Sequence, residues 1–393
     1  ASEYGLYFSN NQGEKWIKLS TGLPTISVRD VVIQKRENDL VLATFGRGFY
    51  VLDDFSSLRK LNTSNSNEVI LFDVKEALQY NPIRSGTSSQ GSSYYTSKNP
   101  PYGAIFSYNL PDSYKSLKSL RSKREKELDK LNKDIPFVGW DELDKEINET
   151  KSKIILEIRD DNGDLVDRIN GSTKKGINRV SWNLSKPLPT ILDSNSRWSR
   201  SSLTVKPGKY SVHLLELVQG GVNELTKSKT FDVKRIRENV LKNPLNSKID
   251  EFILELNKFE IEYSVMISNY IKSKKKQSSF NNTLRFIKNI DSDLLNKLNE
   301  LNDQMNLIDV LLYGSKSKKE IMEKDITLVS ERISIAKRGF YGNSYGPTKQ
   351  HMDSFGIAKD QWDSILPRVE KFIKAVGVLS NDLEQLGAPI ILN

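Results

Sequence analysis

Residues 1–80 alternate between apolar and polar positions in short runs, which is the pattern expected of β-strands. Residues 4–8 (YGLYF) and 16–19 (WIKL) form the first two runs, joined by a connection rich in turn-forming residues. Three further runs of the same kind follow, at residues 28–33, 40–44 and 49–52. We therefore expect a β-hairpin followed by a small antiparallel sheet.

The connection at residues 9–16 (SNNQGEKW) carries side chains suited to a tight hairpin. Ser9 and Asn11 can hydrogen-bond to the backbone of the turn, and Gly13 tolerates a positive φ. Trp16 can pack back over the hairpin. All four roles are structural, so this hairpin gives no reason to expect catalysis.

A second β-rich stretch, residues 101–235, follows a segment rich in Ser, Gly, Asn and Pro at residues 81–100. We predict that this segment is a linker. About seven short strands, two of them separated by an Asn-Gly turn, predict an Ig-like β-sandwich. The Lys- and Glu-rich residues 112–152 predict a helical insertion, which Pro136 and Gly139 divide into two helices.

Residues 236–393 change to the three-to-four-residue apolar spacing of amphipathic helices. Short connections between the helices predict an antiparallel bundle. The dense basic run from Lys272 to Lys276 suggests a charged loop between two helices. The fold class expected for the whole chain is multidomain: partial β-propeller blades over residues 1–80, an Ig-like sandwich with a helical insertion, and a helical bundle.

Composition narrows the chemistry. The 393 residues include no Cys and two His, which excludes disulfides and thiol catalysis and disfavours structural zinc. The net charge of +9 is spread over helical stretches that also carry Asp and Glu. Nucleic-acid binding is therefore the weakest of three hypotheses for the function of this chain. No apolar run is long enough for a transmembrane segment. Because Ala1 opens within a strand pattern, we expect a mature product or a fragment.

The acidic pair Asp53 and Asp54 is the first candidate for hydrolysis. Neighbouring residues of one strand point to opposite faces, so the pair cannot flank one glycosidic bond, and a turn is favoured. Arg47 resembles the arginines that sialidases direct at a carboxylate, but such sites need several arginines. A salt bridge or a backbone contact is favoured for Arg47.

The acidic run at residues 160–164 (DDNGD) lacks the spacing and the final Glu of an EF-hand, so a hairpin turn is favoured. Gly46 to Gly48 lacks the third glycine of a dinucleotide site and is predicted to be a turn. His213 lies in a predicted strand and His351 in a predicted polar loop, and neither has a partner at metal spacing. We expect no metal, no cofactor and no catalytic residue in this chain.

The least ordinary loop is residues 338–348 (RGFYGNSYGPT), where three aromatic residues lie among glycines. Aromatic rings can stack on the apolar faces of a sugar or a peptide. The candidate contact residues for a ligand or partner are Arg338, Phe340, Tyr341 and Tyr345. The alternative, which is favoured, is an ordered loop whose aromatic side chains pack onto the bundle.

Several segments together resemble one known family. The segment at residues 40–54 (LVLATFGRGFYVLDD) resembles the last-blade segment of large secreted proteins with neuraminidase-repeat propellers, which are sortilin-like and sialidase-like and often labelled glycosyl hydrolases. Residues 9–16 resemble the Asp-box of such blades, with Asn11 in place of the Asp. The family's Thr-His-Gly-Arg reads Thr-Phe-Gly-Arg at residues 44–47. The resemblance continues at residues 99–106, 136–142, 205–210 and 386–389.

This resemblance implies that the chain is the C-terminal part of a longer bacterial protein that is secreted, periplasmic or displayed on the cell surface. The expected role is non-catalytic: to complete the propeller and to dock other domains or partner proteins. The main expected partner is the upstream propeller polypeptide, from the same precursor or a separate chain. Other cell-envelope proteins or glycans are further candidates. The alternative is an accessory region of a sialidase-like glycoside hydrolase whose active site lies in the upstream propeller.

Overall fold

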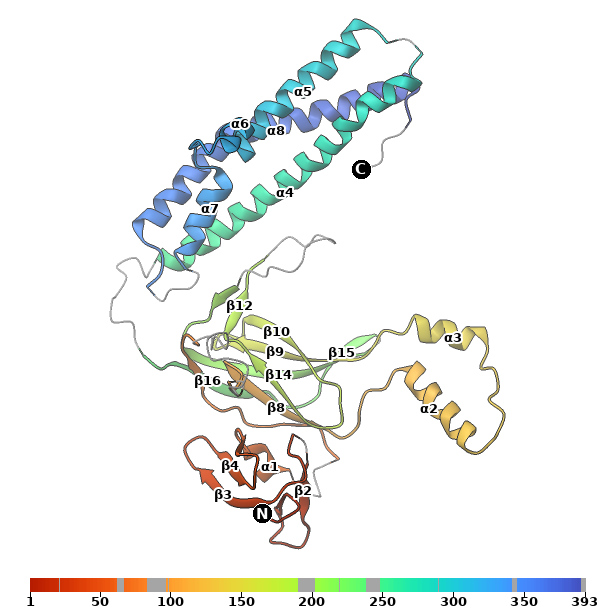
Figure 1. The fold of residues 1–393 in the computed structure, drawn as a ribbon, viewed down its shortest axis with the longest axis vertical. Coiled ribbons are helices and arrows are strands. Elements are labelled where there is room, and N and C mark those ends of the chain that lie inside the picture. The colour runs from red at the N-terminus through yellow and green to blue at the C-terminus, as the bar shows by residue number, and fades with distance from the viewer. Residues whose placement is uncertain are drawn as a thin grey trace. The chain divides into compact units, whose positions relative to one another are not determined.

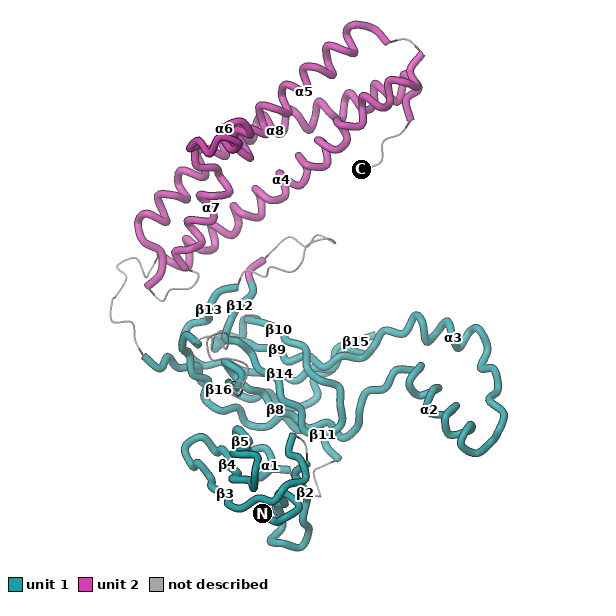
Figure 2. The backbone as a smooth tube through the Cα atoms, in the orientation of Figure 1, with its two compact units in different colours: residues 1–187, 202–237 teal, residues 188–201, 238–393 magenta. Residues whose placement is uncertain are grey.

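The computed structural model describes residues 1–20, 22–61, 67–82, 97, 99–189, 202–218, 220–237, 248–288, 290–340 and 345–389. The chain mixes strands and helices, as predicted (Figure 1). It divides into two compact units, residues 1–187 with 202–237 and residues 188–201 with 238–393 (Figure 2). The predicted linker at 81–100 lies mostly outside the described residues.

The first 60 residues form a hairpin, a three-stranded sheet and one short helix. The hairpin pairs β1 (Leu6–Phe8) with β2 (Ile17–Leu19) in antiparallel register. The sheet has the order β3-β4-β5, with bounds Val28–Gln34, Asp39–Thr44 and Phe49–Leu52. The helix α1 (Ser56–Lys60) follows. We call residues 1–60 the blade segment, after the propeller blade that the sequence resemblance leads us to expect there.

One face of the three-stranded sheet carries the core of the blade segment. Leu6, Val28 and Leu42 are buried there, and partly buried apolar side chains surround them. The packing follows from strand alternation, because Leu42 lies opposite Val31 and Tyr50 on the same face.

Two larger sheets form the centre of the rest of the first unit. One is a strongly curved six-stranded sheet in the order β10-β9-β14-β16-β7, with β15 paired to β14, and the other has the order β11-β8-β6. The strands are β6 (Ile70–Leu71), β7 (Ala77–Gln79), β8 (Ala104–Leu110), β9 (Lys153–Asp160), β10 (Leu165–Gly171), β11 (Gly176–Trp182), β14 (Gly208–Val218), β15 (Gly221–Glu224) and β16 (Lys229–Arg235). A separate short pair joins β12 (Ser185–Pro187) to β13 (Ser202–Thr204).

β6 and β7 fall within residues 1–80 of the sequence, yet they pair with strands of the second β region. β6 lies antiparallel to β8, and β7 lies parallel to β16. Residues 67–80 therefore contribute to these sheets rather than to the β3-β4-β5 sheet.

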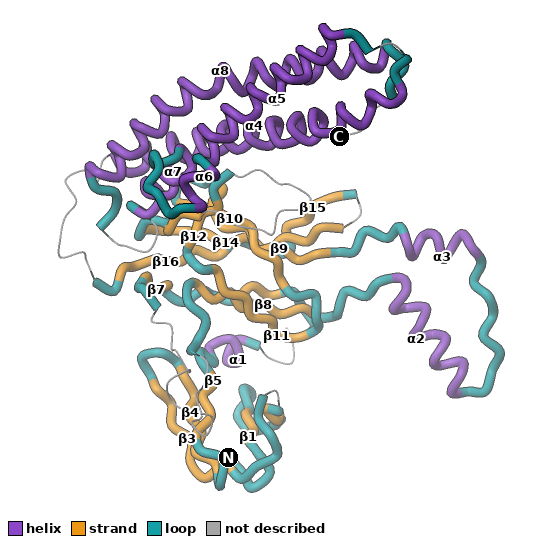
Figure 3. Tube along the Cα trace, turned by 45° about the horizontal axis from the view of Figure 1, so that its top comes forward, coloured by secondary structure: helices purple, strands orange, loops and turns teal. Residues whose placement is uncertain are grey.

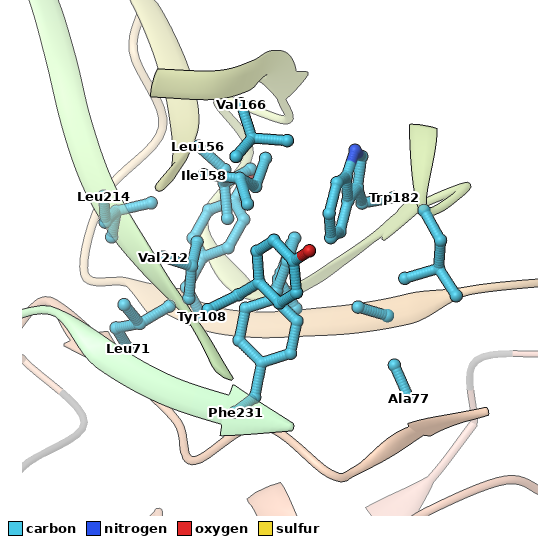
Figure 4. Packing of buried hydrophobic residues seen from close by; sticks show 14 of the residues in the cluster. Leu71, Ala77, Tyr108, Leu156, Ile158, Val166, Trp182, Val212, Leu214 and Phe231 are labelled. Carbon is cyan, nitrogen blue, oxygen red and sulfur yellow. The ribbon is translucent and has the colours of Figure 1, made fainter. Parts of the chain in front are cut away.

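The two larger sheets share one hydrophobic core (Figure 4). Alternate residues of β9 and β14 supply one side of it, and β8 and β11 supply the other. Trp182 stands between the sheets, with its ring centroid 5.8 Å from that of Tyr210 and 6.2 Å from that of Phe231. Its indole N–H remains satisfied by Asp167 and by the Ser185 carbonyl.

Two helices interrupt the second β region, within the predicted insertion at residues 112–152. They are α2 (Leu117–Lys130) and α3 (Trp140–Ile147), and Pro136 lies in the connection between them. Ser116 caps α2 by accepting a hydrogen bond from the Ser119 N–H. Gly139 precedes α3 with φ +93°.

The second unit is helical. Its elements are α4 (Ile249–Thr283), the 3₁₀ turn η3 (Leu284–Phe286), α5 (Ser292–Tyr313), α6 (Lys316–Glu320), α7 (Val329–Arg338) and α8 (Lys349–Gln385). The helices α4 and α8 run parallel to each other. Their aromatic contacts follow the same order along both helices: Phe259 with Phe355, Tyr263 with Trp362, and Tyr270 with Phe372. The intervening helices return in the opposite direction (Figures 1 and 3).

Two sequence expectations for this unit are wrong. The lysine run at residues 272–276 lies inside α4 and is not a loop. Lysine is a good helix former, and Lys274 pairs with Asp309 of α5. His351 lies in the first turn of α8 and not in a loop. Its Nδ1 accepts a hydrogen bond from the Thr348 N–H and lies within hydrogen-bonding distance of the Thr348 hydroxyl, so it helps to cap the start of the helix.

The end of α8 is set by local chemistry. Gly387 has φ +92°, and the Ala388 N–H bonds to the Leu383 carbonyl at 3.0 Å while the Gly387 N–H bonds to the Glu384 carbonyl at 3.1 Å. This is the Schellman arrangement that closes a helix at glycine. Of the helices described, none combines the length and the apolar character needed to span a bilayer.

Candidate functional site

The hairpin connection at residues 9–16 is held by its own side chains. The Ser9 hydroxyl accepts from the Gly13 N–H at 2.9 Å, and the Asn11 side-chain oxygen accepts from the Lys15 N–H at 3.0 Å. Gly13 has φ +92°. Trp16 lies near Gly13 but its side chain is largely exposed. These contacts brace a turn, and the assignment of this turn as an Asp-box stays a prediction.

Asp53 and Asp54 lie just after β5, where the chain turns toward α1. Asp54 adopts φ +40°, and its N–H bonds to the Asp39 carboxylate at 2.9 Å. Arg179 of β11 donates to the backbone carbonyls of both aspartates. Burial and the neighbouring Asp39 raise the pKa of Asp53. The two acids therefore belong to a turn that the arginine holds by its backbone.

The turn from Gly46 to Gly48 joins β4 to β5. Both glycines have positive φ, and the Thr44 N–H and hydroxyl both donate to the Gly48 carbonyl. Arg47 is exposed at the tip of this turn.

The β3-β4-β5 sheet also exposes apolar residues on its second face, opposite its core, where Asp30, Gln34 and Asp39 border them. The antiparallel register places Val32, Val41 and Val51 in one row across the three strands. Ala43 and Phe49 form part of the next row. Val32 is 55% exposed, Val51 56% and Phe49 76%. We call these five residues the open blade face.

An antiparallel sheet that turns one face to water normally alternates apolar and polar side chains along each strand. β4 instead carries the run Leu40 to Ala43, which is apolar toward both faces. β5 carries Phe49 and Val51 outward and Tyr50 toward the core. The open blade face is therefore a candidate interaction surface of the blade segment.

A second feature is a cleft of about 710 Å³ on the six-stranded sheet, on the face opposite the core. Four strands line it, namely β10, β9, β14 and β15, together with Gly163 of the β9-β10 turn. Its apolar lining comes from Ile155, Leu215, Leu217 and Val222, and its polar lining from Glu157, Arg159, Arg168, Ser211, His213 and Glu224.

Glu157 is the polar centre of the cleft. Its side chain is 5% exposed and accepts hydrogen bonds from Arg159 and Arg168, each at 2.7 Å from Nε. Burial opposes ionisation, but the hydrogen bonds from Arg168 and Arg159 outweigh it and hold the pKa of Glu157 below its ordinary value. Strand register places Arg168, Glu157 and His213 in one row. His213 Nδ1 pairs with Glu224 at 2.8 Å.

This arrangement is a saturated ion-pair cluster. Both oxygens of Glu157 are committed to arginines, so Glu157 is held as a carboxylate and cannot readily act as a proton donor. His213 has a carboxylate partner, which the sequence did not predict. Among the described residues, no group of three or more His, Asp or Glu side chains is placed to hold a metal ion.

The acidic run at residues 160–164 forms the β9-β10 turn. The Asp160 carboxylate accepts from the N–H groups of Asn162 and Asp164, each at 3.0 Å. Gly163 has φ +84°. The carboxylate thus satisfies its own turn, which is the Asx pattern of a hairpin.

The loop at residues 338–348 is described only in part, and Tyr341 lies outside the described residues. Phe340 follows α7, and Tyr345 precedes the start of α8. Gly339 lies so close to Pro347 and His351 that a Cβ there would meet the His351 ring at 2.9 Å. Arg338 borders a shallow hollow on α7 with Thr327, Ser330 and Glu331. The proposal that Arg338, Phe340 and Tyr345 contact a ligand stays a prediction.

Sequence reasoning missed both the open blade face and the cleft. The signal for the first was present, because residues 40–43 are apolar without alternation. The cleft had no such signal, since its residues come from four strands that only the register brings together.

Comparison with protein-family models, with curated proteins and with solved structures finds no match to this chain.

Proposed function

We propose that the chain is a non-catalytic interaction segment that completes the β-propeller of a larger secreted or cell-envelope protein. The observation that carries this proposal is the open blade face. Val32, Phe49 and Val51 expose apolar surface on a sheet whose other face already holds a core. A contiguous apolar face of this kind is typical of a surface that another polypeptide covers.

The chemistry of the open blade face favours a second β-sheet as the covering element. Rows of β-branched side chains at alternate positions pack well against the pleated surface of another sheet. β3 and β5 are the end strands of the three-stranded order among the described residues. A propeller blade has four strands. An added fourth strand would pair with the backbone of an end strand, and a neighbouring blade would cover the open blade face.

The hairpin at residues 9–16 supports the same proposal. Its side-chain bonds from Ser9 and Asn11 to the turn backbone are the bracing expected of an Asp-box, the motif that marks blades of the family that this sequence resembles. Nothing in the hairpin is arranged for catalysis. We accordingly assign it to the architecture of the blade.

We further propose that the two packed sheets of residues 67–237 are an Ig-like sandwich. Trp182 is buried between the sheets, as a central tryptophan is in Ig domains. Tyr210, near the start of β14, donates its hydroxyl to the Lys206 carbonyl at 2.7 Å. This is the geometry of a tyrosine corner. Such a sandwich would serve as a rigid spacer after the blade.

The experiment for the main proposal uses the polypeptide encoded immediately upstream of Ala1, expressed separately. The full chain should bind it, and a variant that lacks residues 1–60 should not. The circular dichroism of the deleted variant should retain the helical signal of the second unit. An upstream sequence without repeated short-strand patterns, or glycosidase turnover by this chain alone on a panel of sialosides and glucans, would contradict the proposal.

A further inference from the structure

The helical insertion extends from the sandwich as an arm made of α2, residues 131–139 and α3 (Figures 1 and 3). All residues of the arm lie in the described range 99–189, and each of them is at least partly exposed. Trp140 is 73% exposed and Ile147 79%. Further exposed apolar residues of the arm are Leu117, Leu120, Leu131, Ile135 and Phe137.

Helices of 14 and 8 residues are marginal in water by themselves, because most helix stability in proteins comes from packing an apolar face. α3 has such a face, since Trp140, Leu143 and Ile147 recur at helical spacing. The ring of Phe137 lies edge-on to Trp140, with centroids 5.1 Å apart. The arm therefore carries an ordered apolar surface that the described chain does not cover.

The two helices meet only near the base of the arm. The Glu149 carboxylate accepts from the Leu117 N–H at 2.9 and 3.0 Å, and Arg121 forms a two-point ion pair with Glu146. Beyond this pair the helices diverge toward the connection at residues 131–139 (Figures 1 and 3). The two helices of the arm thus form an open V.

The charges of the arm are segregated between its helices. Six basic and three acidic side chains give α2 a net charge of +3, and one basic and four acidic side chains give α3 a net charge of −3. Within one arm, the ion pair of Arg121 with Glu146 uses only one charge of each sign from the two helices. The remaining excess faces solvent on both.

We propose that the arm is a self-association site whose occupant is the arm of a second copy of this chain. In a twofold contact, α2 of each copy meets α3 of the other. The contact therefore contains two symmetry-related pairs, each of one helix with net charge +3 and one with net charge −3. The four helices then bury the apolar faces around Trp140 and Ile147 in a small bundle. A second copy supplies this complementary pattern by construction, whereas an unrelated partner would need to match it.

The test is the sedimentation velocity of the full chain over a range of concentrations at low salt. We expect a reversible dimer that weakens as salt is added, because its ion pairs are exposed and screened. Reversing α3 with Asp141→Lys and Glu142→Lys should raise the dimer dissociation constant at least about tenfold. Reversing α2 with Lys126→Glu and Lys130→Glu should do the same. Neither variant touches Arg121 or Glu146.

Mixing the two reversed variants should restore association as a heterodimer, since each then carries the charge that the other lacks. This mixture also shows that both variants are folded. The matched control, Lys272→Glu with Lys275→Glu on exposed positions of α4, should leave the dimer unchanged. A chain that is monomeric at all soluble concentrations would overturn the proposal, as would a dimer that both reversed variants preserve.

Discussion

Val51 of β5 lies directly opposite Val41 of β4, and Val41 lies directly opposite Val32 of β3. The row is apolar across the whole sheet, although Val32 and Val51 are more than half exposed. On the other face of the same strands, Leu42 is 4% exposed and belongs to the core. One face of this small sheet is thus packed in a core, and its other face is exposed.

This difference predicts unequal effects on stability. Leu42→Ala should lower the free energy of unfolding by about 2–5 kcal/mol, because it removes buried methylene groups and leaves a cavity. Val51→Thr should change it by less than about 0.5 kcal/mol, because the side chain is exposed in the isolated chain. Urea titration followed by tryptophan fluorescence measures both. A Val51→Thr cost equal to that of Leu42→Ala would show that the open blade face is already covered.

Glu157 provides a prediction about pH. Glu157→Gln should destabilise the six-stranded sheet by about 1–3 kcal/mol, because two arginines lose a charged acceptor while their exposure to solvent limits the loss. Since the arginines hold the pKa of Glu157 below its ordinary value of about 4.3, the carboxylate stabilises the fold above about pH 4. That contribution is lost as the pH falls through the lowered pKa.

Acid titration of the wild type and of Glu157→Gln, monitored by near-ultraviolet circular dichroism, checks this sign. The difference in unfolding free energy between the two proteins should be constant near neutral pH and should shrink in acid. Arg36→Gln is the control, because the Arg36–Glu37 pair is exposed and should contribute little. A difference that grows as the pH falls would contradict the assignment.

Gly103, just before β8, lies close against the end of β11. A Cβ at this position would lie 1.8 Å from the Trp182 carbonyl oxygen, and its φ of +106° also disfavours any side chain. Gly103→Ala should therefore lower the free energy of unfolding by more than about 4 kcal/mol and disrupt the pairing of β8 with β11. Gly163→Ala, with φ +84° but open space around it, should cost only about 1–2 kcal/mol. Similar losses for the two variants in thermal unfolding would refute the steric explanation.

Tyr270 links α4 to α5 inside the helical unit. It is fully buried, and its hydroxyl lies 2.8 Å from Asp309 Oδ1 and 3.2 Å from the Met305 carbonyl. Burial and the contact with Asp309 raise the pKa of Tyr270 well above its ordinary value. Its stabilising contribution is therefore complete below about pH 10 and declines at higher pH, where the unfolded chain ionises first.

Tyr270→Phe should lower the stability of the helical unit by about 1–2 kcal/mol, because Asp309 loses a buried donor while its pair with Lys274 remains. Ultraviolet difference spectra between pH 9 and 11 should show no ionisation of Tyr270 before the unit unfolds, a range set by the ordinary tyrosine pKa of about 10. If Tyr270→Phe is as stable as the wild type, the hydroxyl bond has no structural role.

Local sequence signals predicted the elements more reliably than their partners. Alternation located β3, β4, β5 and β9, and the turn residues around Gly46 and Gly163 end the strands where expected. Trp140 begins α3, as the glycine before it suggests. These features depend on residues close in sequence, so the pattern contains the information.

Long-range pairing was not predictable in the same way. β7 joins β16 across more than 150 residues, and only the folded register reveals that Arg168, Glu157 and His213 share a row. The lysines at 272–276 were expected in a loop, because the sequence does not show that Asp309 faces Lys274 from α5. Sites whose residues come from separate strands could therefore be located only from the structure.

The open blade face yields the most direct test of the proposed function. Isothermal titration of the full chain with the polypeptide encoded upstream of Ala1 should show binding, and Val51→Lys should weaken it at least about tenfold by placing a charge in an apolar contact. Val378→Lys, a similarly exposed valine on α8, is the matched control and should bind like the wild type. Equal affinity for the wild type and Val51→Lys, or no binding by either, would contradict the account.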